Sequence, residues 1–79
     1  METKDLFLKL QEIFRDVLDN EEIVLTELTC ANDIDEWDSL ANVQLIVAIE
    51  REFGIRFTSL EIPSWKNVGD MVDCIQSKL

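Results

Sequence analysis

The sequence DSLANVQLIVAIEREFG, at residues 38–54, decides the fold. Asp38 and Ser39 favour a helix start, because their side-chain oxygens can accept hydrogen bonds from the first N–H groups of a helix. The residues that follow are mostly apolar and include no helix breaker before Phe53. Gly54 is the residue type best able to adopt the left-handed conformation that ends a helix. The stretch therefore predicts a helix over residues 39–53.

Two amphipathic segments flank this helix in the sequence. Residues 4 to about 19 repeat apolar side chains at the spacing of one helical face, which predicts a first helix with Thr3 as its N-cap. The last segment begins at Asn67, a second predicted N-cap, with Asp70 in the first turn. The predicted inner face of this last helix comprises Val68, Met71, Val72, Ile75 and Leu79.

The connection between residues 19 and 37 is long and contains many apolar residues. A loop of this composition is too apolar to lie free in water, so we expect it to pack over the core, with a short helical turn at residues 22–28. Its apolar residues are Ile23, Val24, Leu25, Leu28, Ile34 and Trp37.

The second connection predicts one more short helix. Thr58 and Glu61 have the spacing of a capping box, and Pro63 should end the helix after about one turn. Trp65 is expected to anchor this piece to the core. The chain thus predicts an all-α fold, a small four-helix bundle with three longer helices, one short helix and a long first loop. We expect residues 1–79 to form a single domain.

The chain is strongly acidic, with a formal net charge of −10 over 79 residues. This charge repels nucleic acids and anionic membranes, and no apolar stretch is long enough to span a bilayer. We therefore expect protein partners that carry Lys/Arg patches, although the same charge would also serve solubility alone.

The residues required for catalysis or metal binding are missing. There is no His to act as a base for a serine nucleophile, or to complete a zinc site with Cys30 and Cys74. The acidic loop at Asp33 and Asp35 places Trp37 where a calcium ligand belongs. We expect no enzymatic activity and no metal. Two distant cysteines without a signal peptide predict free thiols and a cytoplasmic location.

Ser39 is the candidate functional residue. Its hydroxyl is expected at a helix N-terminus, where exposed N–H groups and the helix dipole would favour an anionic group esterified to it. The alternative is that Ser39 only caps the helix.

The sequence also resembles the acyl carrier proteins. The resemblance rests on Asp38-Ser39-Leu40, on the spacing from Val43 to Ile55 and on the segment NVGD at residues 67–70. It implies that Ser39 carries a 4′-phosphopantetheine arm, derived from coenzyme A and attached by a phosphopantetheinyl transferase. The thiol of this arm would hold acyl groups as thioesters. The resemblance also implies acyl-activating, acyltransferase and synthase-type partner enzymes with basic docking patches, and a monomeric protein.

Two further sets of residues follow from this resemblance. Partner enzymes would dock on Asp38, Leu40, Val43, Val47, Glu50 and Ile62. The acyl chain would be sheltered by Ile46, Ile49, Phe57, Ile62, Trp65 and Met71. The alternatives are ordinary core packing for Leu40, Val43, Ile62 and most of the acyl-chain residues, and a solvated charge for Glu50.

The chain departs from the family pattern near the attachment motif. Trp37 precedes Asp38-Ser39-Leu40 where many members have glycine. Along the docking helix, where fatty-acid carriers usually have acidic residues, this chain has Ala41, Gln44 and Arg51. Ile62 and Trp65 are bulky for a roomy acyl pocket, which favours a short or polar cargo. These departures favour a dedicated lipid, polyketide or other secondary-metabolite pathway. A peptidyl, aryl or aminoacyl carrier of the same fold, and a non-carrier acidic helical adaptor, stay open as alternatives.

Overall fold

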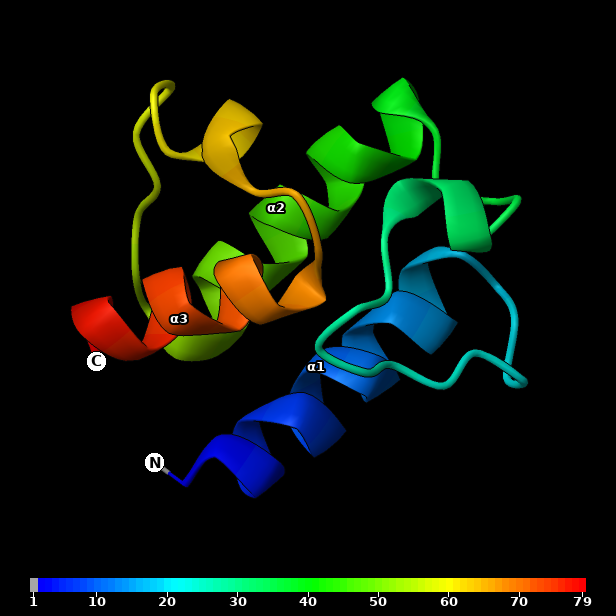
Figure 1. Cartoon of the computed structure of the whole chain (residues 1–79), viewed down its shortest axis with the longest axis horizontal. Coiled ribbons are helices and arrows are strands. Elements are labelled where there is room, and N and C mark those ends of the chain that lie inside the picture. The colour runs from blue at the N-terminus through cyan, green and yellow to red at the C-terminus, as the bar shows by residue number, and fades with distance from the viewer. Residues whose placement is uncertain (1) are drawn as a thin grey trace.

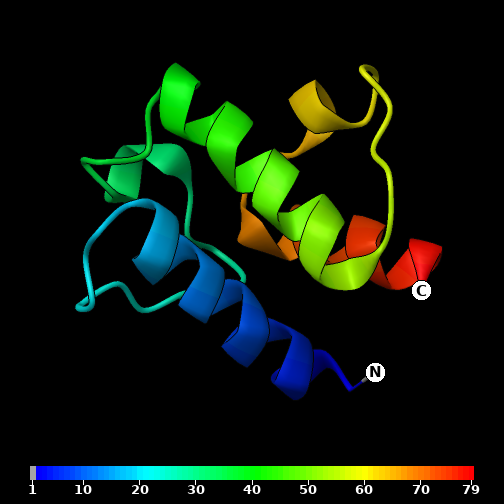
Figure 2. The ribbon, with the colours of Figure 1, turned by 180° about the vertical axis from the view of Figure 1, so that it is seen from behind.

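A computed structural model describes residues 2–79, and within these residues the chain forms three α-helices, two 3₁₀ turns and no β-strand (Figure 1). The elements in chain order are α1 (Thr3–Val17), η1 (Ala31–Asp33), α2 (Ser39–Phe53), η2 (Ile62–Ser64) and α3 (Val68–Lys78). Helix α1 packs against both α2 and α3, and α1 and α2 run antiparallel side by side (Figure 2). The predicted all-α fold with a long first loop is confirmed.

Helix α1 contributes Leu6, Leu10 and Phe14 to the core, and none of these side chains is exposed. The helix ends where Asp19 adopts a left-handed conformation, with φ 52°. The prediction for its start is wrong, because Thr3 is the first helical residue and Glu2 the N-cap, without a capping side-chain hydrogen bond. Backbone bonding already begins at Glu2, whose carbonyl accepts the N–H of Leu6.

Helix α2 has both predicted ends. The Asp38 carboxylate accepts a hydrogen bond from the N–H of Ala41 at 2.8 Å, and Gly54 ends the helix with φ 64°. Its inner face buries Ala41, Leu45, Ile46 and Ile49.

The long loop between α1 and α2 packs over the core as expected, because Ile23, Leu25 and Ile34 are buried. The expected helical turn at residues 22–28 is absent, and the loop's 3₁₀ turn lies instead at Ala31–Asp33. Side chains of α1 hold the backbone of the loop: Gln11 accepts the N–H of Leu25, and Arg15 donates to the carbonyl of Ile23. The N–H of Leu25 and the carbonyl of Ile23 are thus bonded to α1 and not to each other's neighbours, as a helical turn at residues 22–28 would require. The loop also leaves Val24 and Leu28 exposed, contrary to expectation.

The predicted short helix forms only a 3₁₀ turn, Ile62–Ser64. The capping box itself is present, because Glu61 accepts the N–H of Thr58 and the Thr58 hydroxyl accepts the N–H of Glu61. Pro63 lies inside the turn and does not end a preceding helix. Proline is tolerated there because the first positions of a helix need no N–H.

Helix α3 is held at its start by the long loop. Its first two N–H groups, on Val68 and Gly69, donate to the carbonyls of Thr29 and Glu27 at 2.8 and 2.9 Å. A Cβ atom on Gly69 would lie 2.9 Å from the Glu27 oxygen, so this close approach requires glycine. Asn67 caps the helix as predicted.

The inner face of α3 buries Val68, Met71, Val72 and Ile75. Leu79 was predicted on this face and is exposed, because it lies at the C-cap, beyond the last helical residue.

Candidate functional site

Ser39 is the first residue of α2 and is exposed. Its neighbour Asp38 accepts the Ala41 N–H and so caps the helix. The Ser39 hydroxyl makes no hydrogen bond to any residue from 2 to 79. The capping role considered for Ser39 is therefore filled by Asp38.

The backbone around Ser39 suits an anionic group. The N–H groups of Ser39 and Leu40 have no acceptor in the described part of the chain, whereas the next N–H groups, of Ala41 and Asn42, are bonded to Asp38. Unpaired N–H groups and the positive end of the helix dipole favour negative charge at this position. A phosphodiester on the Ser39 hydroxyl fits this environment.

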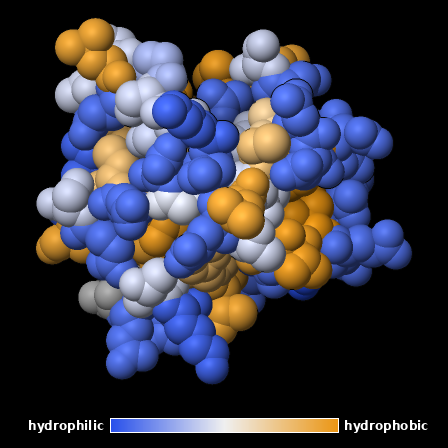
Figure 3. All heavy atoms as spheres, in the orientation of Figure 1, coloured by the Kyte–Doolittle hydropathy of each residue, from blue (hydrophilic) through white to orange (hydrophobic). Residues whose placement is uncertain are grey.

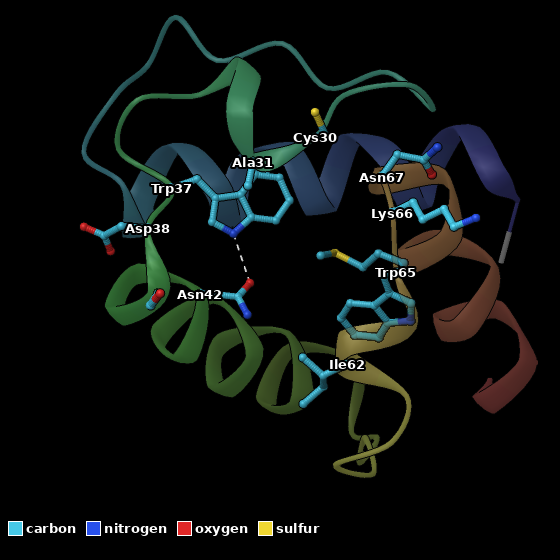
Figure 4. Close-up of a pocket in the computed structure, with 11 residues that line it drawn as sticks. Cys30, Ala31, Trp37, Asp38, Asn42, Ile62, Trp65, Lys66 and Asn67 are labelled. Carbon is cyan, nitrogen blue, oxygen red and sulfur yellow. Dashed lines mark hydrogen bonds between the residues drawn. The ribbon is translucent and has the colours of Figure 1, made fainter.

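A cavity of about 430 Å³ lies beside Ser39 (Figure 4). It separates the start of α2 from the segment that joins η2 to α3. Its lining residues are Cys30, Ala31, Trp37, Asp38, Ser39, Asn42, Ile62, Trp65, Lys66, Asn67 and Met71.

Two tryptophan rings lie on opposite sides of this cavity (Figure 4). Trp37 packs edge-on against Phe14, with 4.9 Å between ring centroids, and its ring N–H donates to Asn42 at 3.0 Å. Trp65 packs edge-on against Phe57 at 4.8 Å. Such edge-to-face contacts are favourable and fix the orientation of both rings.

The structure separates the residues expected to shelter an acyl chain into two groups. Ile62, Trp65 and Met71 line the cavity. Ile46 and Ile49 are buried residues of α2 that do not line the cavity. Phe57 does not line it either and packs edge-on against Trp65.

Sequence reasoning missed several lining residues. Trp37 had been considered as a loop residue and as a departure from the family pattern, but not as part of a cavity, and Asn42, Lys66 and Asn67 had been given no role in a cavity. The spacing of Asn42 contained a usable signal, because a residue three positions after Ser39 lies on the same helical face.

The residues expected to dock partners are arranged along the outer side of α2. Leu40, Val43 and Val47 are 71%, 60% and 44% exposed. This exposure excludes the alternative that Leu40 and Val43 are core residues. Glu50 is only partly exposed, and its carboxylate accepts the N–H of Phe57 at 2.8 Å. Asp38 is exposed.

Ile62, the remaining docking candidate, is half-buried and lines the cavity. Sequence reasoning assigned Ile62 both to the docking residues and to the acyl-chain residues. The structure places it in the lining of the cavity.

Charged side chains cover much of the surface, and Figure 3 shows hydrophilic residues over most of one face, with hydrophobic residues in separate patches. Lys78 pairs with Glu61 at 3.0 Å and Lys9 with Glu52 at 3.0 Å.

The N–H of Thr58 and the Lys78 ammonium lower the pKa of Glu61 from 4.5 to about 2. Burial and the neighbouring Glu61 carboxylate raise the pKa of the Cys74 thiol, which disfavours the reactive thiolate.

Residues 2–79 contain no group of three or more His, Cys, Asp or Glu side chains placed to hold a metal ion. No helix among them is long and apolar enough to cross a bilayer.

Comparison with known proteins identifies the family. The family model for the phosphopantetheine attachment site matches residues 9–75. The acyl carrier protein of Coprothermobacter proteolyticus is 36% identical over 80 aligned residues, covering 100% of this chain and 96% of the relative. That of Thermosynechococcus vestitus is 35% identical, covering 100% and 98%.

A solved structure has the same fold. The solution structure of a holo acyl carrier protein from Geobacter metallireducens matches with a TM-score of 0.87 and 47% identity, covering 91% of this chain and 83% of that one. The chain therefore belongs to the acyl carrier protein family and is a carrier with a phosphopantetheine prosthetic group.

Proposed function

We propose that Ser39 is the attachment site of the 4′-phosphopantetheine arm. The observation that carries this proposal is the exposed Ser39 hydroxyl, which has no hydrogen-bond partner in residues 2–79 because Asp38 caps the helix. In the attachment reaction, the Ser39 oxygen bonds to a phosphorus of coenzyme A and the pyrophosphate bond breaks. Adenosine 3′,5′-bisphosphate leaves, and the serine proton passes to a base of the transferase.

The arm supplies a thiol that holds an acyl group as a thioester. The chain's own residues present the attachment point and offer the free N–H groups of Ser39 and Leu40 to the phosphodiester. A tethered acyl group meets each partner at a high effective concentration, so the carrier needs only weak docking and no catalytic residues. We propose that the chain is not itself an enzyme.

Docking is proposed along the exposed apolar residues Leu40, Val43 and Val47. The two acidic residues within α2 are both engaged, Glu50 with the Phe57 N–H and Glu52 with Lys9. Apolar contact therefore contributes more along this helix than its acidic side chains do. A basic patch on a transferase or synthase would meet the exposed acidic residues before α2, which are Asp35, Glu36 and Asp38. Of these, Glu36 accepts a hydrogen bond from Asn20 and Asp38 caps the helix, so Asp35 is the carboxylate without a partner among residues 2–79.

The wider setting is also a proposal. Residues 1–79 would act as one monomeric carrier domain in the cytoplasm, where the thiols of Cys30 and Cys74, both free, would stay reduced. Gln44 and Arg51, both exposed on α2, support partners from a dedicated lipid, polyketide or other secondary-metabolite pathway.

The test is loading by a promiscuous phosphopantetheinyl transferase with coenzyme A and Mg²⁺, followed by intact-mass measurement. The wild-type protein should gain one arm and Ser39→Ala none. Ser59→Ala is the matched control, because Ser59 is also exposed and lies outside α2, and it should load normally. Loading of Ser39→Ala, or failure of the correctly folded wild type to load, would contradict the proposal.

A further inference from the structure

The end of α2 that lies away from Ser39 carries two arginines on one surface hollow. Arg51 and Arg56 are both exposed, and both line a hollow of about 550 Å³. Its other lining residues are Val47, Glu50, Gly54 and Ile55. Val47 and Arg51 also line a neighbouring hollow of about 540 Å³ that includes Val43. Because the two hollows share these residues, they form one surface along the outer side of α2.

Neither Arg51 nor Arg56 has an ion pair or a side-chain hydrogen bond among residues 2–79. This is unexpected in a chain with 17 acidic and 7 basic residues. The carboxylates next to Arg51 in the sequence are engaged elsewhere, because Glu50 bonds to the backbone after α2 and Glu52 pairs with Lys9. The hollow therefore presents two unpaired positive charges, which repel each other and would both attract an anionic group.

The helix dipole accounts for only one of these arginines. Arg51 lies in the last turn of α2, where a cation interacts favourably with the negative end of the dipole. Arg56 follows the left-handed cap at Gly54 and lies outside the helix, and the effect of the dipole falls off beyond the last turn. The guanidinium group presents a planar fork of donors that matches a carboxylate. A carboxylate in this hollow could therefore bond to both arginines.

The charge along the outer side of α2 changes sign from one end to the other. Exposed acidic residues precede Ser39, the apolar residues Val43 and Val47 follow it, and Arg51 ends the row. At 1.5 Å per residue, Arg51 lies about 18 Å along the helix from Ser39. A surface with opposite charges at its two ends fixes the orientation of its partner, because reversed docking would bring like charges together.

We propose that this cationic end of α2, formed by Arg51 and Arg56, receives a carboxylate side chain of the partner enzyme that lies next to an apolar side chain of that enzyme. The proposal rests on the docking along α2 that the proposed function includes. The carboxylate bonds to the two guanidinium groups and the apolar side chain packs on Val47. The contact directs the partner's active site toward Ser39. A partner with Lys or Arg at this position is disfavoured.

An NMR titration of the unmodified protein with two capped peptides tests this contact. The probes are Ac-Glu-Leu-Leu-Glu-amide and its uncharged counterpart Ac-Gln-Leu-Leu-Gln-amide. An ionic strength of about 0.15 M screens the net charge of −10. We expect the acidic peptide to shift the side-chain Nε–H signals of Arg51 and Arg56 and the backbone amide signals of residues 47–56. It should bind about threefold more tightly than the uncharged peptide.

Two variants and one control identify the groups responsible. Arg51→Gln and Arg56→Gln should each reduce the preference for the acidic peptide, and the double variant should abolish it. Lys4→Gln removes the same charge from an exposed residue outside both hollows and should keep the preference. Unchanged ring N–H signals of Trp37 and Trp65 show that each variant is folded.

Equal affinity for the two peptides, shifts only outside residues 47–56, or a preference that persists in the double variant would overturn the proposal. Shifts of the same signals that depend on protein concentration, without any peptide, would assign the hollow to a second copy of the chain and would also overturn it. None of these measurements involves loading of Ser39. A negative result therefore leaves the attachment proposal intact, and failure of loading is detected separately by intact mass.

Discussion

At the scale of single residues, the order of Asp38 and Ser39 determines what each side chain does. Asp38 has extended backbone dihedrals, with φ −107° and ψ −173°, so its carboxylate can turn back to the Ala41 N–H. Ser39 is already helical and projects its hydroxyl outward. The hydroxyl is therefore available for modification without loss of the cap.

This arrangement predicts a stability difference between two neighbouring substitutions. Asp38→Ala removes the cap and should lower the free energy of unfolding by about 1 kcal/mol. Ser39→Ala removes no hydrogen bond within residues 2–79 and should change it by less than about 0.5 kcal/mol. Urea denaturation of the unmodified proteins measures both.

Asp38→Asn is the control for this pair, because its side-chain oxygen still accepts the Ala41 N–H and most of the stability should remain. If Ser39→Ala proved more destabilising than Asp38→Ala, Ser39 would be the cap and the interpretation of its free hydroxyl would be wrong.

A second residue-scale prediction concerns pH. The pKa of Glu61 is lowered from 4.5 to about 2, so its ionised form stabilises the fold above pH 4.5, and this contribution is lost as the pH falls through about 2. Wild type should therefore be more stable than Glu61→Gln near neutral pH, and the difference should shrink between these two values. Thermal melts of both proteins across this range measure the effect. A difference that does not change with pH would contradict the lowered pKa.

At the scale of elements, the outer side of α2 carries the proposed docking surface. Val43 and Val24 provide a matched pair, because they are 60% and 65% exposed and only Val43 lies on α2. Val43→Glu should raise the KM of a phosphopantetheinyl transferase about tenfold, which corresponds to about 1.4 kcal/mol of binding. Val24→Glu places the same charge on the long loop and should leave KM nearly unchanged. Equal effects of the two substitutions would show that charge, and not the α2 surface, is responsible.

Elements with local signals could be predicted from the sequence. Asp38, Gly54 and Asn67 end or begin helices through bonds or dihedrals within a few residues of themselves, and all three predictions are confirmed. The long loop was harder, because Gln11 bonds to Leu25, fourteen residues away, and prevents the expected turn. The capping box of Thr58 and Glu61 was predicted correctly, but the structure has a 3₁₀ turn at Pro63 where a short helix was expected.

The candidate site divides in the same way. The place of Ser39 at the start of α2 could be predicted from the helix-start signal, and its attachment role, suggested by the family resemblance, stays a prediction. The cavity could not, because it depends on Trp37 packing on Phe14 and Trp65 packing on Phe57, and local patterns do not predict these contacts. Ile49 was expected to shelter an acyl chain, but it is a core residue with none of its surface exposed and does not line the cavity.

At the scale of the whole molecule, the long loop joins the parts that form the site. Its carbonyls at Glu27 and Thr29 hold the start of α3, while its later residues, Cys30 and Trp37, line the cavity. The same loop leads directly to Asp38 and the start of α2. The proposed attachment residue, the cavity and the exposed side of α2 therefore occur together only in the assembled fold.

The central claim is that the arm is attached to Ser39, and peptide mapping tests it most directly. Trypsin cleaves after Arg15 and Arg51, so the peptide of residues 16–51 contains Ser39 and none of the other serines, Ser59, Ser64 and Ser77. After treatment with transferase and coenzyme A, tandem mass spectrometry should find the arm on Ser39 within this peptide. An arm found on any other peptide, or on Thr26 or Thr29 of this one, would contradict the account.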